Sequence, residues 1–247
     1  MKYYTYLILL NLFFLFNKNH LFAIDNLITR EKIELLNVAY SHNKRTFMCN
    51  CSFDKIKVNY DDCSYFPKVN NDKAHEVKWK QLINSKFIFR RYPEWKLGHN
   101  SCKTKKGDKY KRKKCVKKLY KNELKLINND LHLYYPIIKQ ISIMMRNKRF
   151  GTINKERRKF GECNLEIGKL YIEPRDSIKG DIARTFLYFS ENYMKNNFLK
   201  DKQMKLFKTW SSNDPVDQWE CERNKNIKKL TGISNNILDH LCEKYSK

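Results

Sequence analysis

Hydrophobic residues recur at helical spacing most clearly in the last third of the chain. This spacing predicts one buried helix face made of Ile182, Phe186, Phe189 and Tyr193. A second helix is predicted to begin near Asp201 and to turn inward Met204, Phe207 and Trp210. Large aromatic residues at regular spacing favour core packing over a ligand-binding role.

A third helix is predicted to begin at Asp214 and Pro215. Aspartate is a good N-cap residue, and proline suits the first helical position. Gly232 predicts the end of this helix, because glycine readily adopts the left-handed conformation there. One side of the helix is expected to carry Val216, Trp219, Arg223, Ile227 and Leu230.

The region from Ile24 to His99 has short apolar runs broken by turn residues, which predicts short strands and loops. The stretch from Val77 to Phe89 is compatible with either a helix or a strand. Only seven glycines are present and none forms a phosphate-binding loop, which argues against a nucleotide-binding fold.

The N-terminus predicts export. Lys2 precedes an apolar run from Tyr6 to Phe16, and Ala23 is a plausible cleavage point. We expect a signal peptide over residues 1–23 and a single domain over residues 24–247. An uncleaved anchor is the alternative for the first segment, and after cleavage we expect no integral membrane segment.

An even number of cysteines behind an export signal predicts a disulfide framework. The eight residues are Cys49, Cys51, Cys63, Cys102, Cys115, Cys163, Cys221 and Cys242. Full pairing into four disulfides is the prediction, and their connectivity stays open. A zinc site is disfavoured, because the one close pair has a single residue between its cysteines.

Charge indicates a polyanionic partner. The formal net charge is +25, of which the signal segment contributes Lys2 and Lys18, so the mature chain carries +23. A basic segment spans residues 102–125, with eleven lysines or arginines and one acid between Lys103 and Lys121. The segment is either a tethered nucleic-acid contact or a solvated surface. The candidate contact residues are Lys111, Arg112, Lys113, Lys114 and Arg149.

Several motifs together point to one known family. Asp214–Arg223 contains Pro-Val followed by Trp-Glu-Cys-Glu-Arg, and Lys179–Phe186 begins Lys-Gly-Asp-Ile-Ala-Arg. Nearer the N-terminus stand a Cys-x-Cys element at Thr46–Cys51 and a Cys-x-Tyr element at Asp62–Lys68. With the order and spacing of the eight cysteines, these motifs resemble the bacterial endonuclease I family. The resemblance runs from Thr46 to Cys242.

The resemblance implies an α+β domain built around a ββα-metal nuclease core of the His-Me finger type, cross-linked by disulfides. It also implies sequence-non-specific cleavage of DNA or RNA in the bacterial periplasm or outside the cell. In that family a histidine is the general base. A neighbouring glutamate and an asparagine hold one divalent metal, typically Mg²⁺.

The Glu-His pair of that family is missing from this sequence. In a forward alignment from Tyr65 and Pro67, Val77 and Trp79 match and the pair falls on Lys80 and Gln81. In a backward alignment from Gly98 and His99, the pair falls on Phe89 and Arg90. The two alignments differ because the chain carries an insertion of about nine residues. Both remain open at this point.

The family's asparagine positions are also changed. The His-Asn motif becomes His132-Leu133, so Leu133 stands where the metal-binding asparagine is expected, and a later Val-Asn-Gly motif places Ser142 at its asparagine. These changes predict no retained metal ligand and therefore no cofactor. A relocated site at His75-Glu76 is the sharpest alternative for retained chemistry.

The leading hypothesis is therefore an exported nuclease-fold protein that binds DNA or RNA, or another polyanion, but no longer cuts nucleic acid. Such a protein is a pseudoenzyme. One rival is an active divergent endonuclease with a relocated site. Another is a cationic envelope-binding protein, because anionic polymers and lipid headgroups are attracted by the same charge.

Overall fold

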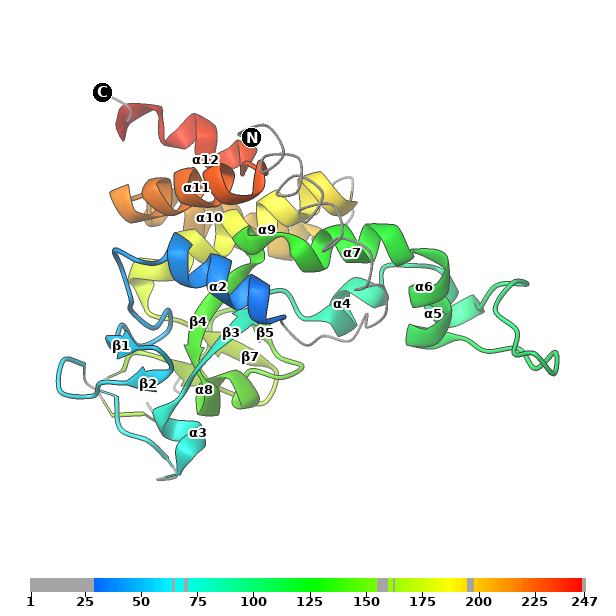
Figure 1. Ribbon diagram of the computed structural model, residues 1–247, viewed down its shortest axis with the longest axis horizontal. Helices are drawn as coiled ribbons and strands as arrows, with labels where there is room; N and C mark the ends of the chain where they lie inside the picture. The colour runs from blue at the N-terminus through cyan, green and yellow to red at the C-terminus, as the bar shows by residue number, and fades with distance from the viewer. Residues whose placement is uncertain are drawn as a thin grey trace, which may run out of the picture.

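The computed structural model describes residues 29–63, 65–68, 71–154, 160–161, 163–194 and 198–245. The segment predicted to be a signal peptide lies outside these ranges, so that prediction stays untested. Helices and short strands alternate in the first part of the chain and helices alone make up the last part (Figure 1). The α+β class expected from the sequence is confirmed.

The expectation of only short strands and loops before His99 is wrong, because several helices also form in this region. Helix α2 (Arg30–Ala39) begins behind the side-chain cap of Thr29 and buries Leu36 completely. The undecided stretch divides into a strand and a helix. The elements of this region are β1 (Phe53–Asp54), β2 (Lys57–Val58), α3 (Asp72–His75), β3 (Val77–Gln81), α4 (Ser85–Phe89) and α5 (Glu94–Leu97).

Two antiparallel strands and a helix form a ββα unit in the middle of the fold. Strand β3 pairs with β4 (Tyr134–Ile138), with Lys80 opposite Tyr135 and Gln81 opposite Tyr134. Helix α8 (Lys139–Met144) follows β4 directly and packs on both strands. In Figure 1 the strands lie between α8 and the layer of C-terminal helices. Strand β4 is buried along its whole length, so it is central to the core.

A small sheet and a helical layer complete the domain. The sheet has the order β5 (Arg149–Phe150), β7 (Tyr171–Glu173) and β6 (Glu166–Ile167). The predicted helices appear as α9 (Lys179–Met194) and α10 (Asp201–Asn213), which pack against each other and bury Phe186, Phe207 and Trp210. The remaining elements are η1 (Leu131–Leu133), η2 (Asp176–Ile178), α11 (Gln218–Thr231), α12 (Asn236–Leu241) and η3 (Glu243–Tyr245).

The predicted start of the third helix is wrong. Helix α11 begins at Gln218, where Asp217 is the N-cap and accepts a hydrogen bond from the Glu220 amide at 2.8 Å. Asp214 ends α10 instead, and its carboxylate accepts a hydrogen bond from the Gly180 amide at 2.7 Å. A tertiary contact therefore takes the side chain that the local pattern assigned to capping. The end of the helix at Gly232, with φ of 73°, is confirmed.

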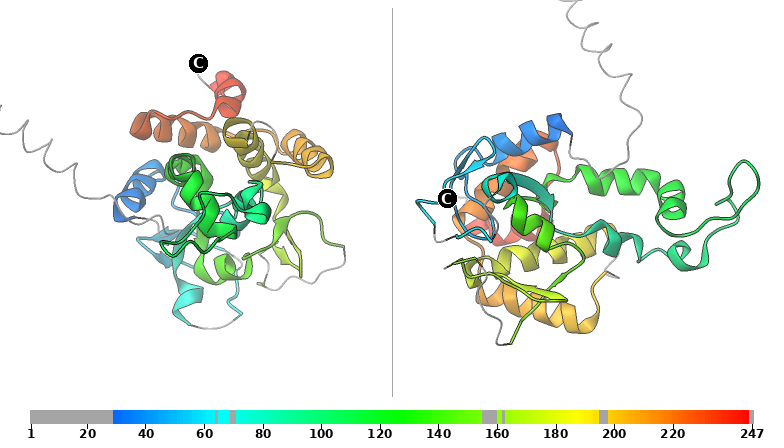
Figure 2. Two further views of the ribbon diagram at one scale, coloured as in Figure 1. Left: turned by 90° about the vertical axis from the view of Figure 1, so that its right-hand side faces the viewer. Right: turned by 90° about the horizontal axis from the view of Figure 1, so that it is seen from below.

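The basic segment forms an arm that projects from the body (Figures 1 and 2). Its residues lead from α5 through a loop to α6 (Arg112–Leu119), which continues into α7 (Lys121–Asn129). The Cys102–Cys115 disulfide closes the loop, so the prediction of a tethered segment is confirmed, although its second half is helical. Cys115 and Val116 are completely buried, whereas Lys111 to Lys114 are exposed.

All eight cysteines are paired, as predicted, and the structure decides their connectivity. The pairs are Cys49–Cys163, Cys51–Cys63, Cys102–Cys115 and Cys221–Cys242. The first pair joins positions 114 residues apart, while the other three close loops of local sequence. Among the described residues, no helix has the length and apolar character needed to cross a membrane.

Candidate functional site

The C-terminal motifs that carry the family resemblance form a buried structural cluster. Arg184 is 1% exposed, and its guanidinium donates to the Glu220 carboxylate at 3.0 Å and to the Asp214 carbonyl at 2.7 Å. Asp181 lies 3.5 Å from the same guanidinium. Burial and the neighbouring Glu220 raise the pKa of Asp181 well above its usual value. A Cβ atom on Gly180 would overlap the Asp214 carbonyl oxygen, which explains the glycine.

Arg223, the last residue of the C-terminal motif, holds β4 and η1 against the helices. Its guanidinium donates to the Tyr40 hydroxyl at 2.6 Å and to the carbonyls of His132 at 3.0 Å and Tyr134 at 3.2 Å. It also stacks on the Tyr135 ring, with 4.3 Å between the guanidinium carbon and the ring centroid. The set Gly180, Asp181, Arg184, Asp214, Glu220 and Arg223 is called the framework cluster below. These residues contact one another and the neighbouring backbone, which indicates a structural role.

The two positions of the forward alignment lie at the end of β3, inside the ββα unit. Burial lowers the pKa of Lys80 to about 8, and the like charges of Lys78 and Arg146 contribute to the same shift. No hydrogen bond or ion pair to the Lys80 ammonium is found among the described residues. The side-chain amide nitrogen of Gln81 is buried without a hydrogen-bond partner in the same part of the chain. Both side chains are therefore poorly satisfied where they stand.

The two asparagine positions lie on different sides of this unit. Ser142 is 6% exposed on α8, and Arg146, whose charge acts on Lys80, follows four residues later. Leu133 is completely buried in η1, which packs against α9 and α11. Its carbonyl accepts a hydrogen bond from the Leu82 amide at 2.9 Å. Ser142 thus belongs to the helix that packs on β3, whereas Leu133 belongs to the helical layer.

The donor set at these positions does not fit a divalent metal. An ammonium group repels a cation, and leucine has no lone pair for one. The Gln81 carbonyl and the Ser142 hydroxyl are neutral and weak compared with the carboxylates that hard cations prefer. Among the described residues, no group of three His, Cys, Asp or Glu side chains is placed to hold a metal ion.

The backward alignment places the pair outside the ββα unit. Phe89 ends α4 and is 5% exposed, so it belongs to the hydrophobic core. Arg90 is the C-cap residue of α4, is exposed, and lies over the Trp95 ring at 6.0 Å. A histidine or a carboxylate at these two positions would not stand on a strand that pairs with β4.

Two histidines that survive in the region have structural surroundings. His132 is 1% exposed and lies between Asp130, at 2.9 Å from Nδ1, and Asn224, at 3.0 Å from Nε2. His75, from the alternative His75-Glu76 pair, packs against the Tyr60 ring at 5.1 Å. Glu76 forms an ion pair with Lys139. The alternative pair therefore has a carboxylate that is already neutralised.

The nucleic-acid candidates divide between two places. Lys111, Arg112, Lys113 and Lys114 are exposed on the arm, where Arg112 lies over the Trp95 ring at 5.7 Å and Lys114 over the Tyr110 ring at 4.5 Å. Arg149 stands apart from them on β5, exposed, and lies over the Phe87 ring at 5.4 Å. The structure therefore does not bring Arg149 together with the four arm residues.

Two cations of the ββα unit, Lys78 and Arg146, were not predicted from the sequence. Lys78 could have been found from its position two residues before Lys80, because residues two apart on a strand share a face. Arg146 has no such signal until α8 is known to pack on β3. With Lys80, these two charges give the site a positive potential, which suits an anion and not a metal ion.

Comparison with known proteins gives a consistent result. The model of the family described as Endonuclease I matches residues 22–242. The chain is 29% identical over 215 residues to an extracellular deoxyribonuclease of Aeromonas hydrophila, covering 84% of this chain and 87% of that protein. It is also 29% identical over 211 residues to a periplasmic deoxyribonuclease of the same species, covering 83% and 82%.

A third relative is Endonuclease-1 of Buchnera aphidicola subsp. Acyrthosiphon pisum, 30% identical over 240 residues, which cover 94% of this chain and 89% of that protein. The four disulfides and the extracellular or periplasmic relatives fit an exported protein, as the sequence predicted. The family model matches nearly the whole length of the chain, and the family motifs form the framework cluster around the ββα unit. The chain belongs to the endonuclease I family.

Proposed function

We propose that this protein binds DNA as an exported pseudoenzyme of its family, without metal-dependent cleavage. The observation that carries the proposal is Lys80, a poorly solvated cation at the end of β3 with further positive charges beside it. Under the forward alignment this lysine stands where the family has its glutamate metal ligand. A cation there offers charge to a phosphate group but no ligand to a metal.

The choice of DNA rests on the relatives and on charge. The Aeromonas relatives are named deoxyribonucleases, and the mature chain would carry +23. An exposed basic arm supports contact with the phosphate backbone, which carries no sequence information, so we expect sequence-indifferent binding. RNA is the second candidate partner, since the same backbone chemistry serves both.

The loss of cleavage follows from two missing parts. Phosphodiester hydrolysis in the family needs a base to activate water and a metal to neutralise the phosphate. Gln81 does not accept a proton near neutral pH, and Lys80 does not hold a metal. A general base alone contributes about 10²–10⁴ in rate, so the absence of both parts is expected to leave no efficient turnover.

A plasmid assay with the pure mature protein tests the proposal. We expect a mobility shift of the plasmid that weakens with salt, and no nicking with Mg²⁺ above that seen with chelator. Nicking that requires Mg²⁺ and disappears with chelator would contradict the loss of cleavage. No shift at low salt would contradict DNA binding and favour the cationic envelope-binding alternative.

The relocated-site alternative is separated by one variant. If His75 and Glu76 carried the chemistry, His75→Ala would abolish nicking. Because Glu76 is paired with Lys139 and His75 packs on Tyr60, we expect His75→Ala to leave both plasmid binding and the background of nicking unchanged. Disappearance of a metal-dependent activity in this variant would establish the rival.

A further inference from the structure

A small cavity with a cationic lining lies just past the end of β3. Its volume is about 140 Å³, and Leu82 and Asn84, which follow Gln81 closely, form one of its sides. Five cationic residues line it, namely Arg90, Arg91, Lys148, Arg149 and Lys200. Four phenylalanines also line it, and among the described residues neither aspartate nor glutamate does. It is called the Phe–Arg pocket below.

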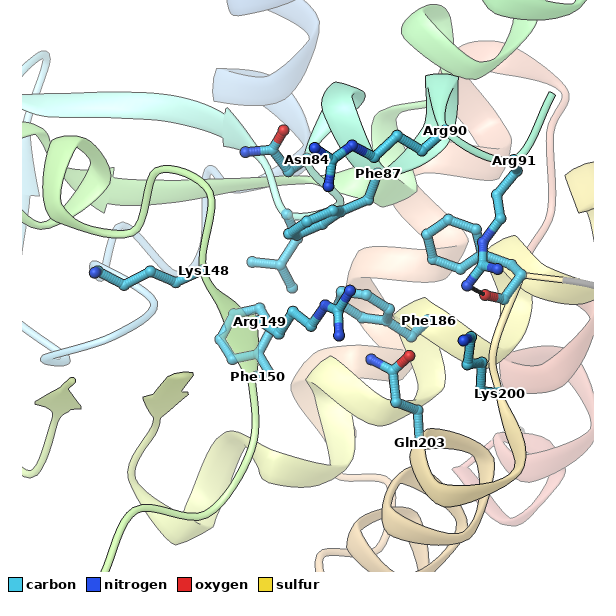
Figure 3. Close-up of a pocket in the computed structure, with 12 residues that line it drawn as sticks. Asn84, Phe87, Arg90, Arg91, Lys148, Arg149, Phe150, Phe186, Lys200 and Gln203 are labelled. Atoms are coloured by element: carbon cyan, nitrogen blue, oxygen red, sulfur yellow. Dashed lines mark hydrogen bonds between the residues drawn. The ribbon is translucent and has the colours of Figure 1, made fainter. Parts of the chain in front are cut away.

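Segments that are far apart in the chain build this pocket. Phe87, Arg90 and Arg91 come from α4 and the turn after it, where the forward and backward alignments require the insertion of about nine residues. Arg149 comes from β5 and Lys200 from the residue before α10. Figure 3 shows the Arg149 and Lys200 side chains approaching the cavity from opposite sides to Arg90 and Arg91. The insertion thus supplies part of the pocket wall.

The arginines are held in place by aromatic rings and backbone and not by carboxylates. Arg91 donates to the Phe198 carbonyl and lies over the Phe198 ring at 5.4 Å. Arg149 lies over the Phe87 ring at the same distance of 5.4 Å. Burial and the nearby Arg149 lower the pKa of Arg91. Within the described part of the chain, no salt bridge neutralises either guanidinium.

This arrangement selects a ligand by charge, shape and size. Guanidinium groups bind phosphate through paired, charge-assisted hydrogen bonds, and their planes and the phenylalanine rings accept a stacked base. The cavity is smaller than the roughly 300–1,000 Å³ of ordinary ligand sites, so it admits at most about one nucleotide unit.

We propose that the Phe–Arg pocket binds the phosphate-bearing end of a single-stranded nucleic acid. A terminal phosphate is a monoester with a charge of about −1.5 to −2 near neutral pH, whereas each internal phosphodiester carries one negative charge. The excess of cations in the lining therefore favours the end over an internal phosphate. The inference rests on the proposal that the protein binds nucleic acid.

Fluorescence anisotropy with short labelled single strands tests the inference. Three probes of one sequence carry a 5′-phosphate, a 3′-phosphate or no terminal phosphate. We expect one of the phosphorylated strands to bind about tenfold tighter than the unphosphorylated strand, because the terminal phosphate adds charge-assisted hydrogen bonds to the guanidinium groups. Tenfold corresponds to about 1.4 kcal/mol. Equal affinity for all three strands would overturn the inference.

A matched pair of variants assigns the preference to the pocket. Arg149→Gln/Lys200→Gln removes two charges from the lining, and Arg30→Gln/Lys229→Gln removes two exposed charges elsewhere. We expect the first variant to lose the tenfold preference and the second to keep it. A preference that survives in the first variant would overturn the inference. Arg91 is left intact because its hydrogen bond to Phe198 also supports the fold.

Two further measurements separate the causes of a negative result. Inorganic phosphate is added as a competitor, and binding of inorganic phosphate as tight as that of the phosphorylated strand would contradict recognition of a strand end. Affinity for unphosphorylated duplex DNA is measured in parallel. Duplex binding without an end preference would overturn the pocket inference alone, whereas absence of all nucleic-acid binding would overturn the proposed function as well.

Discussion

The framework cluster and the end of β3 differ in whether a poorly solvated cation has an opposite charge beside it. In the framework cluster, Arg184 is almost completely buried, but it is matched by Glu220, by Asp181 and by the Asp214 carbonyl. At the end of β3, Lys80 is surrounded by Lys78 and Arg146 and has no matching carboxylate among the described residues. Charge satisfied within the fold marks a structural role, and charge left unsatisfied within the fold is available to a ligand.

The comparison also explains why the family is recognisable in a chain whose site is altered. The motifs that identify the family lie mostly in the framework cluster, where each side chain has several partners and one change leaves buried groups unpaired. The site residues at β3 and α8 contribute little to that network. They can therefore change while the fold is kept.

The largest expected effect breaks the framework cluster. Glu220→Ala removes the carboxylate that pairs with Arg184 and leaves a buried guanidinium without its main partner. We expect a decrease of about 3–5 kcal/mol in the free energy of unfolding. At roughly 2–4 °C per kcal/mol for a chain of this size, Tm should fall by about 6–20 °C in a calorimetric scan.

The control is Glu34→Ala, which removes the partner of Arg30 in an exposed pair on α2. The Tm of this control is expected to differ from the wild-type Tm by no more than a change of about 0.5 kcal/mol in the free energy of unfolding would cause. If both variants melt at the same temperature, the contrast between satisfied buried charge and surface charge is wrong for this cluster.

The next effect tests the site by restoring it. Lys80→Glu/Gln81→His/Ser142→Asn places a glutamate, a histidine and an asparagine on β3 and α8, which pack against each other. Ser142 is chosen in place of Leu133, the position matched to the metal-binding asparagine, because Ser142 lies on the helix that packs on β3. We expect Mg²⁺-dependent plasmid nicking to rise by about 100-fold over the parent, the lower part of the range for a general base. The matched variant Phe89→Glu/Arg90→His/Ser142→Asn is expected to gain nothing, because its pair lies on α4.

A gain in the second variant and none in the first would show that the backward alignment is the right one. Leu133→Asn serves as a further comparison. Leu133 is completely buried, so we expect this change to lower Tm and add no activity. Activity that depends on Leu133→Asn would show that the metal-binding asparagine belongs at Leu133 in η1 and not at Ser142.

A smaller effect concerns the stability cost of Lys80. Its pKa in the folded protein is about 8, below the usual 10.5, so the unfolded chain binds more protons between these two values. The stability of the wild type therefore rises with pH across that window. Lys80→Met is expected to be about 1–2 kcal/mol more stable than the wild type at pH 7 and to lose this advantage towards pH 10.5.

Urea unfolding at about pH 7, 9 and 10.5 measures this difference. Lys78→Met is the control, because Lys78 is exposed on the same strand and its removal relieves only the repulsion on Lys80, so a smaller stabilisation is expected. A Lys80→Met variant that is less stable than the wild type at pH 7 would mean that the ammonium has a stabilising partner in the fold.

Substitutions in the arm are expected to have the smallest effect on stability. They are expected to have a separate effect on DNA binding. Changing Lys111, Arg112, Lys113 and Lys114 to glutamine should leave Tm nearly unchanged, because the four side chains are exposed. The log–log dependence of duplex DNA affinity on salt should become flatter by about 0.9 for each phosphate that the arm no longer neutralises. Anisotropy titrations at several salt concentrations give the slope.

The matched control changes four exposed lysines outside the arm to glutamine, namely Lys208, Lys225, Lys229 and Lys244. The net charge falls equally in both variants, so long-range attraction is equalised. If the arm variant has the slope of the control, its residues are a solvated surface that does not touch the phosphates.

The sequence by itself determined the features that depend on local pattern. The spacing of Ile182, Phe186 and Phe189 is enough to predict α9, and Gly232 is enough to predict the end of α11. The even cysteine count predicted full pairing. The motifs were also enough to recognise the family, because a motif is matched by its residue types and their order and needs no knowledge of their contacts.

Tertiary structure decided everything that depends on which distant segments meet. Asp214 was predicted to cap a helix, but the Gly180 amide takes its carboxylate and Asp217 becomes the cap. Pairing with β4 places Lys80 and Gln81 in the ββα unit, a register that neither alignment of the sequence could establish. The disulfide connectivity and the Phe–Arg pocket likewise join residues far apart in the chain. Local propensity carries no information on such contacts, because their free energy comes from burial and pairing that exist only after the chain has folded.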